Sequence, residues 1–89
     1  MKTTIIITEC KNPYGKYWLF KDKQSGRKYA EVDRVEGGYK IYSGEWISEV
    51  GRRTGKDSAI AFAQKCVSQQ IAGEVEFKWN VMSVVERWR

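Results

Sequence analysis

A change in hydrophobic period near residue 55 is the feature that most constrains the fold of this chain. Over residues 3–46, apolar and polar residues alternate with a period of two, and a turn signal recurs about every ten residues. This alternation is typical of half-buried β-strands. Over residues 55–72 the apolar residues instead follow the period of an α-helix. The sequence therefore predicts an α+β domain with an antiparallel meander sheet of four to five strands and one long helix on one face.

Glycine-containing turns separate the predicted strands. The strands are expected over residues 3–9, 16–22 and 27–34, with a fourth strand or a bent pair of short strands around Ser43-Gly44. The turns are expected at residues 12–15, 23–26 and 36–38. Alternation in the second strand places Trp18 and Phe20 opposite Tyr17 and Leu19, and in the third it places Ala30 and Val32 opposite Tyr29, Glu31 and Asp33.

The helix is expected over about residues 55–72. Thr54 is a suitable N-cap, Asp57 completes an approximate capping box, and Gly73 supplies the stop. The apolar face consists of Ala59, Ile60, Phe62, Ala63, Cys66, Val67 and Ile71.

The last segment supports two interpretations. One is a short strand over residues 74–79 followed by a helix over 81–88, which Asn80 would cap and in which Val84, Val85 and Trp88 share a face. The other is a single long strand over residues 74–86. In either case residues 1–89 form a single domain.

Localisation and redox state follow from what the apolar runs and the cysteines allow. No apolar run approaches the roughly 20 residues that span a bilayer, and Ile5-Ile6-Ile7 is too short for a signal-peptide core. We therefore expect a cytoplasmic protein that does not enter a membrane. In that compartment Cys10 and Cys66 are expected to be free thiols rather than a disulfide.

The residue types needed for common catalytic sites do not come together in this sequence. It contains no histidine, which excludes a Ser-His-Asp triad. Its two cysteines and its carboxylates do not have the spacing of zinc ligands. The carboxylate pairs Glu31/Asp33 and Glu74/Glu76 each share one face of a strand, where a metal or acid–base role competes with that of a solvated strand face. We expect a protein that is not an enzyme and has no cofactor and no bound metal.

Charge is sorted along the chain and carries the main functional signal. The net charge of +5 arises from +5 over residues 11–28, −3 over residues 29–50 and +3 over residues 51–56, the remainder being neutral. Sorted positive charge suggests an anionic partner. Basic residues interleaved with aromatic ones predict nucleic-acid binding, because cations neutralise phosphates and aromatic rings stack on bases.

The predicted nucleic-acid site combines a basic hairpin with a basic loop at the N-terminus of the helix, where free N–H groups also favour anions. Its basic residues are Lys16, Lys21, Lys23, Arg27, Lys28, Arg52, Arg53 and Lys56. The aromatic residues that could stack on bases or line an interface are Tyr14, Tyr17, Tyr29, Tyr42 and Trp46. A solvated hairpin and a capped helix with a solvated loop remain the structural alternatives.

The run Tyr17-Trp18-Leu19-Phe20-Lys21-Asp22-Lys23-Gln24-Ser25-Gly26-Arg27-Lys28-Tyr29 resembles the opening hairpin of the arm-type DNA-binding domains of phage tyrosine integrases. Gly51-Arg52-Arg53 and the helix from Asp57 resemble the end of such domains, so that the resemblance covers about residues 15–67. It implies an AP2-like three-stranded sheet with one helix, the sheet lying in the DNA major groove. The chain departs from that pattern by an acidic insertion at about residues 30–50 and by an added element at each end.

A protein-binding role is the alternative function. The chain has more aromatic residues than a core of this size needs, and tyrosine, tryptophan and arginine dominate interface hot spots. Such a protein would be an inhibitor or adaptor from a phage or other mobile element, for example one that blocks a host defence or a host enzyme. A strand at residues 3–9 or 74–79 could also be an exposed edge through which a homodimer forms.

Overall fold

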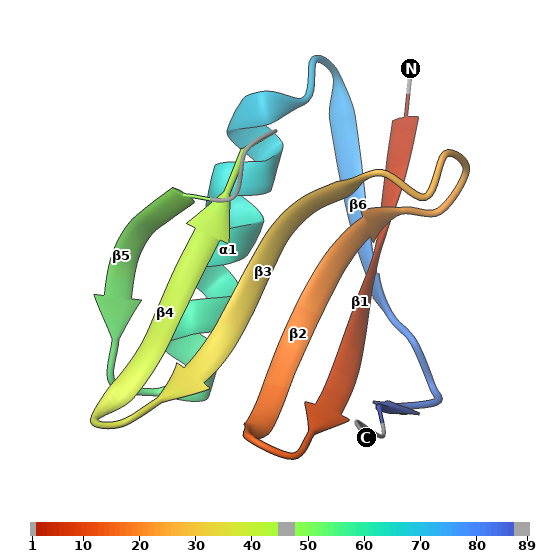
Figure 1. Ribbon diagram of the computed structural model, residues 1–89. Helices are drawn as coiled ribbons and strands as arrows, with labels where there is room; N and C mark the ends of the chain where they lie inside the picture. The colour runs from red at the N-terminus through yellow and green to blue at the C-terminus, as the bar shows by residue number, and fades with distance from the viewer. Residues whose placement is uncertain (1, 45–47, 87–89) are drawn as a thin grey trace.

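The computed structural model describes residues 2–44 and 48–86, which form one sheet and one helix (Figure 1). In chain order the elements are β1 (Lys2–Asn12), β2 (Gly15–Asp22), β3 (Lys28–Val35), β4 (Gly38–Ser43), β5 (Ser48–Arg53), α1 (Lys56–Gln70), β6 (Glu74–Trp79) and β7 (Val84–Val85). The predicted α+β class is confirmed. Of the two alternatives around Ser43-Gly44, the pair of short strands is the closer one, because β4 ends at Ser43 and β5 is a separate strand. Arg52 and Arg53 belong to β5, so the predicted basic loop at residues 51–56 is wrong over its first half.

The sheet is a curled mixed sheet rather than a strict meander. Its strand order is β5-β4-β3-β2-β1-β6, with the short β7 also paired to β1. Strands β1 to β5 are joined by antiparallel pairing of successive neighbours, whereas β6 and β7 run parallel to β1. The predicted meander fails at this point because α1 carries the chain from β5, at one edge, to β6, at the other (Figure 1).

Period-two alternation in the strands places the core as the sequence predicts. Ile5, Ile7, Trp18, Phe20, Ala30, Val32 and Ile41 point to the face that carries α1, and each is at most 2% exposed. The tight turns between strands depend on glycine, because Gly26 and Gly37 have φ values of +77° and +80°. Residues with a Cβ rarely adopt such values.

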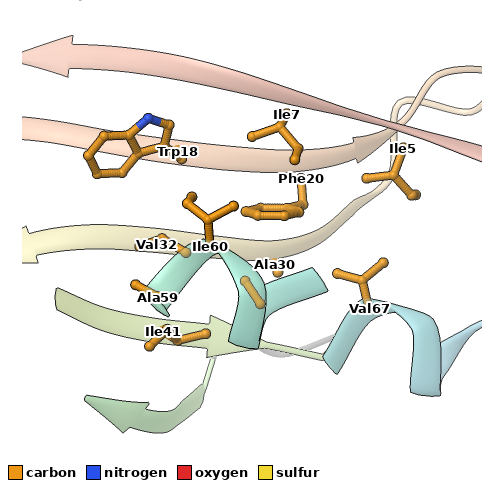
Figure 2. Packing of buried hydrophobic residues seen from close by; sticks show 11 residues of the cluster. Ile5, Ile7, Trp18, Phe20, Ala30, Val32, Ile41, Ala59, Ile60 and Val67 are labelled. Atoms are coloured by element: carbon orange, nitrogen blue, oxygen red, sulfur yellow. The ribbon is translucent and has the colours of Figure 1, made fainter. Parts of the chain in front are cut away.

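The helix packs on the sheet through small and branched side chains. Ala59, Ala63 and Val67 are fully buried, and Ile60 is 6% exposed. Figure 2 shows Ala59, Ile60 and Val67 facing the strand residues, which include Phe20, Ala30 and Ile41. At its edge the core is extended by Phe77 of β6, whose ring lies edge-on to Phe20 with centroids 6.4 Å apart.

The ends of the helix differ from the prediction. The helix covers Lys56–Gln70 rather than residues 55–72, and its N-cap is Gly55, whose extended backbone makes no side-chain cap hydrogen bond. Thr54 is therefore not the N-cap, because the first helical residue is Lys56 and Gly55 occupies the position before it. At the other end Ile71 is already extended, two residues before the predicted stop at Gly73.

The last segment is close to the long-strand alternative, and the predicted terminal helix is wrong over residues 81–86. β6 pairs with Lys2–Ile7 and β7 pairs with Cys10 and Lys11, so that residues 74–85 follow β1 with one interruption. The Asn80 side chain accepts a hydrogen bond from the Met82 N–H, closing a turn instead of capping a helix. Trp88 lies outside the described residues.

This pairing makes β1 an internal strand, since β2 lies on one side of it and β6 and β7 lie on the other. The prediction that residues 3–9 form an edge strand is therefore wrong. The prediction that residues 74–79 form an edge strand is confirmed, because β6 lies at the end of the strand order. Both cysteines are free, as expected: Cys10 lies on the sheet face away from α1, and Cys66 lies on α1 itself.

Among the residues that the structure describes, no helix is both long and apolar enough to cross a lipid bilayer.

Candidate nucleic-acid interface

The predicted basic residues separate into two groups at opposite ends of the sheet. Lys21, Lys23, Arg27 and Lys28 surround the loop between β2 and β3. Lys16, at the start of β2, lies at the other end, where β5 finishes and α1 begins with Lys56 (Figure 1). The hairpin and the loop before the helix therefore do not form one continuous site.

At the helix end, strand pairing assembles a row of cations across the sheet. Lys11 of β1 is opposite Lys16 of β2, and Tyr39 of β4 lies between Arg34 of β3 and Arg53 of β5. Lys16 precedes Tyr17 and Arg34 follows Asp33, so in this antiparallel ladder both lie one position beyond the Tyr17–Asp33 pair at the same end. The two halves of the row therefore meet between β2 and β3. All four cationic residues are exposed.

The row lies on the sheet face that carries α1. Lys16 and Arg34 are two residues from Trp18 and Val32, which are buried on that face. Arg53 confirms the assignment, since its guanidinium lies 4.4 Å from the centre of the Phe62 ring on α1. We call Lys11, Lys16, Arg34 and Arg53, together with Lys56 at the start of α1, the basic row.

Lys56 links the basic row to two tryptophan rings. Its ammonium lies 5.5 Å from the centre of the Trp18 ring and 5.6 Å from that of Trp79. Both distances are within the range of a cation–π interaction. The first-turn N–H groups of α1 add positive potential here, because Gly55 supplies no side-chain cap. Glu9, next to Trp18 on the same face, and Asp57 in the first turn oppose part of this field.

At the hairpin end of the sheet, two of the predicted cations, Lys28 and Arg27, already have partners within the protein. The Lys28 ammonium is 3.0 Å from a carboxylate oxygen of Glu31, and the Arg27 guanidinium lies 4.8 Å from the centre of the Tyr29 ring. Tyr29 itself packs against the core, because a bulge near Phe20 and Lys21 turns it away from the face that holds Glu31. The expectation that Tyr29 shares the face of Glu31 and Asp33 is therefore wrong.

The sheet face opposite α1 holds a carboxyl pair beside a shallow pocket of about 400 Å³. Glu31, Asp33 and Tyr17 line it together with Lys16 and Arg34 of the basic row. Asp33 Oδ1 is buried without a hydrogen-bond partner. Burial, with the adjacent Glu31 carboxylate as the second cause, raises the pKa of Asp33 to about 7. Within the described parts of the chain, no group of three or more acidic, cysteine or histidine side chains could hold a metal ion.

The predicted aromatic residues do not gather at one place. Tyr14 is 82% exposed in the turn between β1 and β2, near the basic row. Tyr17 and Tyr42 are half-buried on the face opposite α1, across the strands from Asp33 and Glu31. Trp46 lies outside the described residues.

Sequence reasoning missed three residues at this end of the sheet: Lys11 and Arg34 of the basic row, and Trp79 beside Lys56. Lys11 belongs to the first basic cluster but was not assigned to the site, and Arg34 falls within the acidic segment that separates the clusters. Trp79, which is 49% exposed, belongs to the last strand, far along the chain. Only the strand register brings them together. Arg52, which was assigned, pairs with Lys40 in the β4–β5 ladder.

Comparison of the chain with protein-family models, with curated proteins and with solved structures found no match.

Proposed function

We propose that this protein is a small, non-enzymatic module that binds DNA along the basic row. The observation that carries the proposal is the alignment of four exposed cations, Lys11, Lys16, Arg34 and Arg53, across five neighbouring strands, with Lys56 beside them. Such a row can neutralise phosphates regardless of base sequence.

The dimensions of the row suit a phosphate backbone. Neighbouring strands are roughly 4.8 Å apart, so that β1 and β5 lie roughly 19 Å apart across the sheet. A DNA strand carries one phosphate per roughly 3.4 Å of helix axis, which gives five cations enough phosphates to contact. The N-terminus of α1 faces the same side and favours anions as well.

This docking differs from that implied by the integrase resemblance. In those domains the sheet lies in the major groove, whereas here the face opposite α1 carries Glu31 and Asp33, which would repel a phosphate backbone. The basic row lies on the other face, so we place the DNA at the end of the sheet where α1 begins.

Trp79 supports a contribution from unpaired bases. Its ring is half-exposed and lies next to Lys56, an arrangement in which one side chain can stack on a base while the other approaches a phosphate. Trp79→Ala would then weaken binding to single-stranded DNA more than binding to duplex DNA.

A cytoplasmic location belongs to the same proposal. The two thiols are free, and Cys10 and Cys66 lie on opposite sides of the sheet, where they cannot form a disulfide with each other. Free thiols suit a reducing compartment.

Fluorescence anisotropy with labelled duplex and single-stranded oligonucleotides tests the proposal. If all five cations contact phosphates of a duplex, log K falls with log salt with a slope of about −4.5, so that affinity drops about 10² to 10³-fold between 50 and 200 mM salt. Replacing Lys11, Lys16 and Arg34 together by alanine should reduce the slope to about −2.

The matched control removes the same number of cations from the other end of the sheet. Lys21, Lys23 and Arg27, replaced together by alanine, should leave the slope nearly unchanged. Loss of binding in this control with normal binding in the first triple variant would move the site to the hairpin. Absence of binding by the wild-type protein at 50 mM salt would reject DNA as the partner.

A further inference from the structure

Within the part of the chain that the structure describes, no strand pairs with the outer edge of β6, which presents a defined set of backbone hydrogen-bonding groups. The Asn80 N–H donates to the Ile7 carbonyl, 2.8 Å away, so the backbone groups of Asn80 face β1. Because these directions alternate along a strand, the N–H and C=O groups of Glu74, Glu76 and Lys78 also face β1. Those of Val75, Phe77 and Trp79 face away from the sheet, where a further strand could pair with them.

The charges on β6 are of mixed sign and lie on the face opposite α1. The Glu76 carboxylate is 3.0 Å from the Lys2 ammonium and 3.6 Å from that of Lys78. Edge strands commonly resist further pairing by presenting charges that repel a second copy. Here two acidic residues, Glu74 and Glu76, are followed by the basic Lys78, so that repulsion or attraction depends on the register.

One antiparallel register of two β6 strands satisfies both the backbone and the charges. With Phe77 opposite Phe77 of a second copy, Val75 is opposite Trp79 and Glu76 is opposite Lys78. All three residues with outward backbone groups then lie in hydrogen-bonded pairs, and Glu76 and Lys78 fall in the closer, non-hydrogen-bonded positions. A shift by one pair in either direction is less favourable: one shift places Lys78 opposite Lys78, and the other places Glu76 opposite Glu76, a repulsion that offsets part of the attraction between Glu74 and Lys78.

The apolar residues of β6 match the same register. Val75 and Phe77 are partly buried against the core, and Trp79 remains 49% exposed on the same face. In this register Trp79 of each copy lies across the interface from Val75 of the other, which gives the exposed indole ring an apolar neighbour. An aromatic residue opposite a β-branched residue is a favourable cross-strand pair.

We propose that a second copy of this chain covers this edge, forming a two-fold symmetric dimer in which two β6 strands pair antiparallel about Phe77. The sheets of the two protomers then form one continuous sheet, and Lys2, Glu76 and the second copy's Lys78 form a charge network on each side of the two-fold axis. The dimer depends on the backbone edge and the charges of β6 and needs no DNA, although Trp79 lies both at this edge and in the proposed DNA interface.

Sedimentation velocity of the wild-type protein and of two charge variants tests the dimer. The wild-type protein should associate to twice the mass of a 10.4 kDa chain. Glu76→Lys and Lys78→Glu each create two like-charge pairs across the axis, and each should raise the dimer dissociation constant about tenfold or more. An equimolar mixture of the two variants should dimerise again, because every pair between unlike chains is then of opposite sign.

Circular dichroism of each variant separates loss of dimer from loss of fold, and recovery in the mixture requires both chains to be folded. As a second readout, the amides of Val75, Phe77 and Trp79 should become protected from hydrogen exchange as protein concentration rises. A wild-type protein that remains monomeric at its highest attainable concentration would overturn the proposal. So would variants that dimerise as tightly as the wild type.

Discussion

The residue whose ionisation most affects this molecule is Asp33. Its Oδ1 atom is buried without a partner, and its carboxyl group lies next to Glu31, which is itself 3.0 Å from the Lys28 ammonium. Burial, with the adjacent Glu31 carboxylate as the second cause, raises the pKa of Asp33 from 3.8 to about 7. When protonated, this carboxyl group can donate a hydrogen bond to Glu31.

We expect the contribution of Asp33 to stability to be greatest in acid. A pKa raised on folding means that the native state binds the proton more tightly, so this contribution is fully present below pH 3.8 and is lost as pH rises through about 7. Allowing for the half-exposed side chain, Asp33→Asn should stabilise the protein by about 1–2 kcal/mol at pH 8. Urea unfolding at pH 5 and pH 8 measures this, with Glu74→Gln on the exposed edge as control. Equal destabilisation by Asp33→Asn at both pH values would contradict it.

Among the elements, α1 depends most on small side chains. Ala59 and Ala63 are both 0% exposed against the sheet, whereas Ala61, on the outer side of the helix, is exposed. A buried alanine at such a position allows the helix axis to lie close to the strands, because a larger side chain would have to displace either the helix or the sheet.

The loss of stability on replacing an alanine of α1 by a larger residue should therefore depend on whether that alanine faces the sheet or the solvent. Ala63→Leu should overpack the core and cost about 1–3 kcal/mol, which lowers Tm by several degrees in a domain of this size. Ala61→Leu, a chemically identical change two residues away, should alter stability by no more than about 0.5 kcal/mol. Thermal unfolding followed by circular dichroism compares them. Similar losses in both variants would mean that the two sides are packed alike.

The sequence predicted elements better than their assembly. The alternation around Trp18 and Phe20 identified the buried face correctly, since local period and burial agree there. The parallel pairing of β6 with β1 was not predicted, because nothing near Val75 or Phe77 indicates a partner more than sixty residues earlier. The same limit applies to the basic row, in which Arg34 joins Lys11 only through the register of three strands.

At the scale of the whole molecule, α1 connects the two edges of the sheet. It contacts β3, β4 and β5 on one side and β6 on the other. Core side chains of β1, β2, β3 and β4 meet beneath it (Figure 2), and Phe77 of β6 packs against them. No half of the sheet has a separate core, since Ile5, Phe20 and Ile41 belong to one cluster. The sheet and the helix are therefore expected to unfold together.

We accordingly expect two-state unfolding. Tryptophan fluorescence and far-ultraviolet circular dichroism should give the same urea midpoint, with an m-value of about 1–3 kcal/mol/M. The comparison is made at one protein concentration, because a dimer would shift the midpoint with concentration. Two separate transitions would show that part of the sheet is stable without the helix.

The position of β1 between β2 and the strands that end the described chain has a consequence for biosynthesis. One edge of β1 is completed only by β6 and β7, so the nascent chain leaves that edge unpaired while the hairpins and α1 are being made. At roughly 5–20 residues per second, β6 follows β1 out of the ribosome by several seconds. During that interval Phe77 does not yet cover Ile5 and Ile7. The incomplete sheet therefore exposes an apolar strand with an unpaired backbone edge, which chaperones can bind and which is buried in the mature protein.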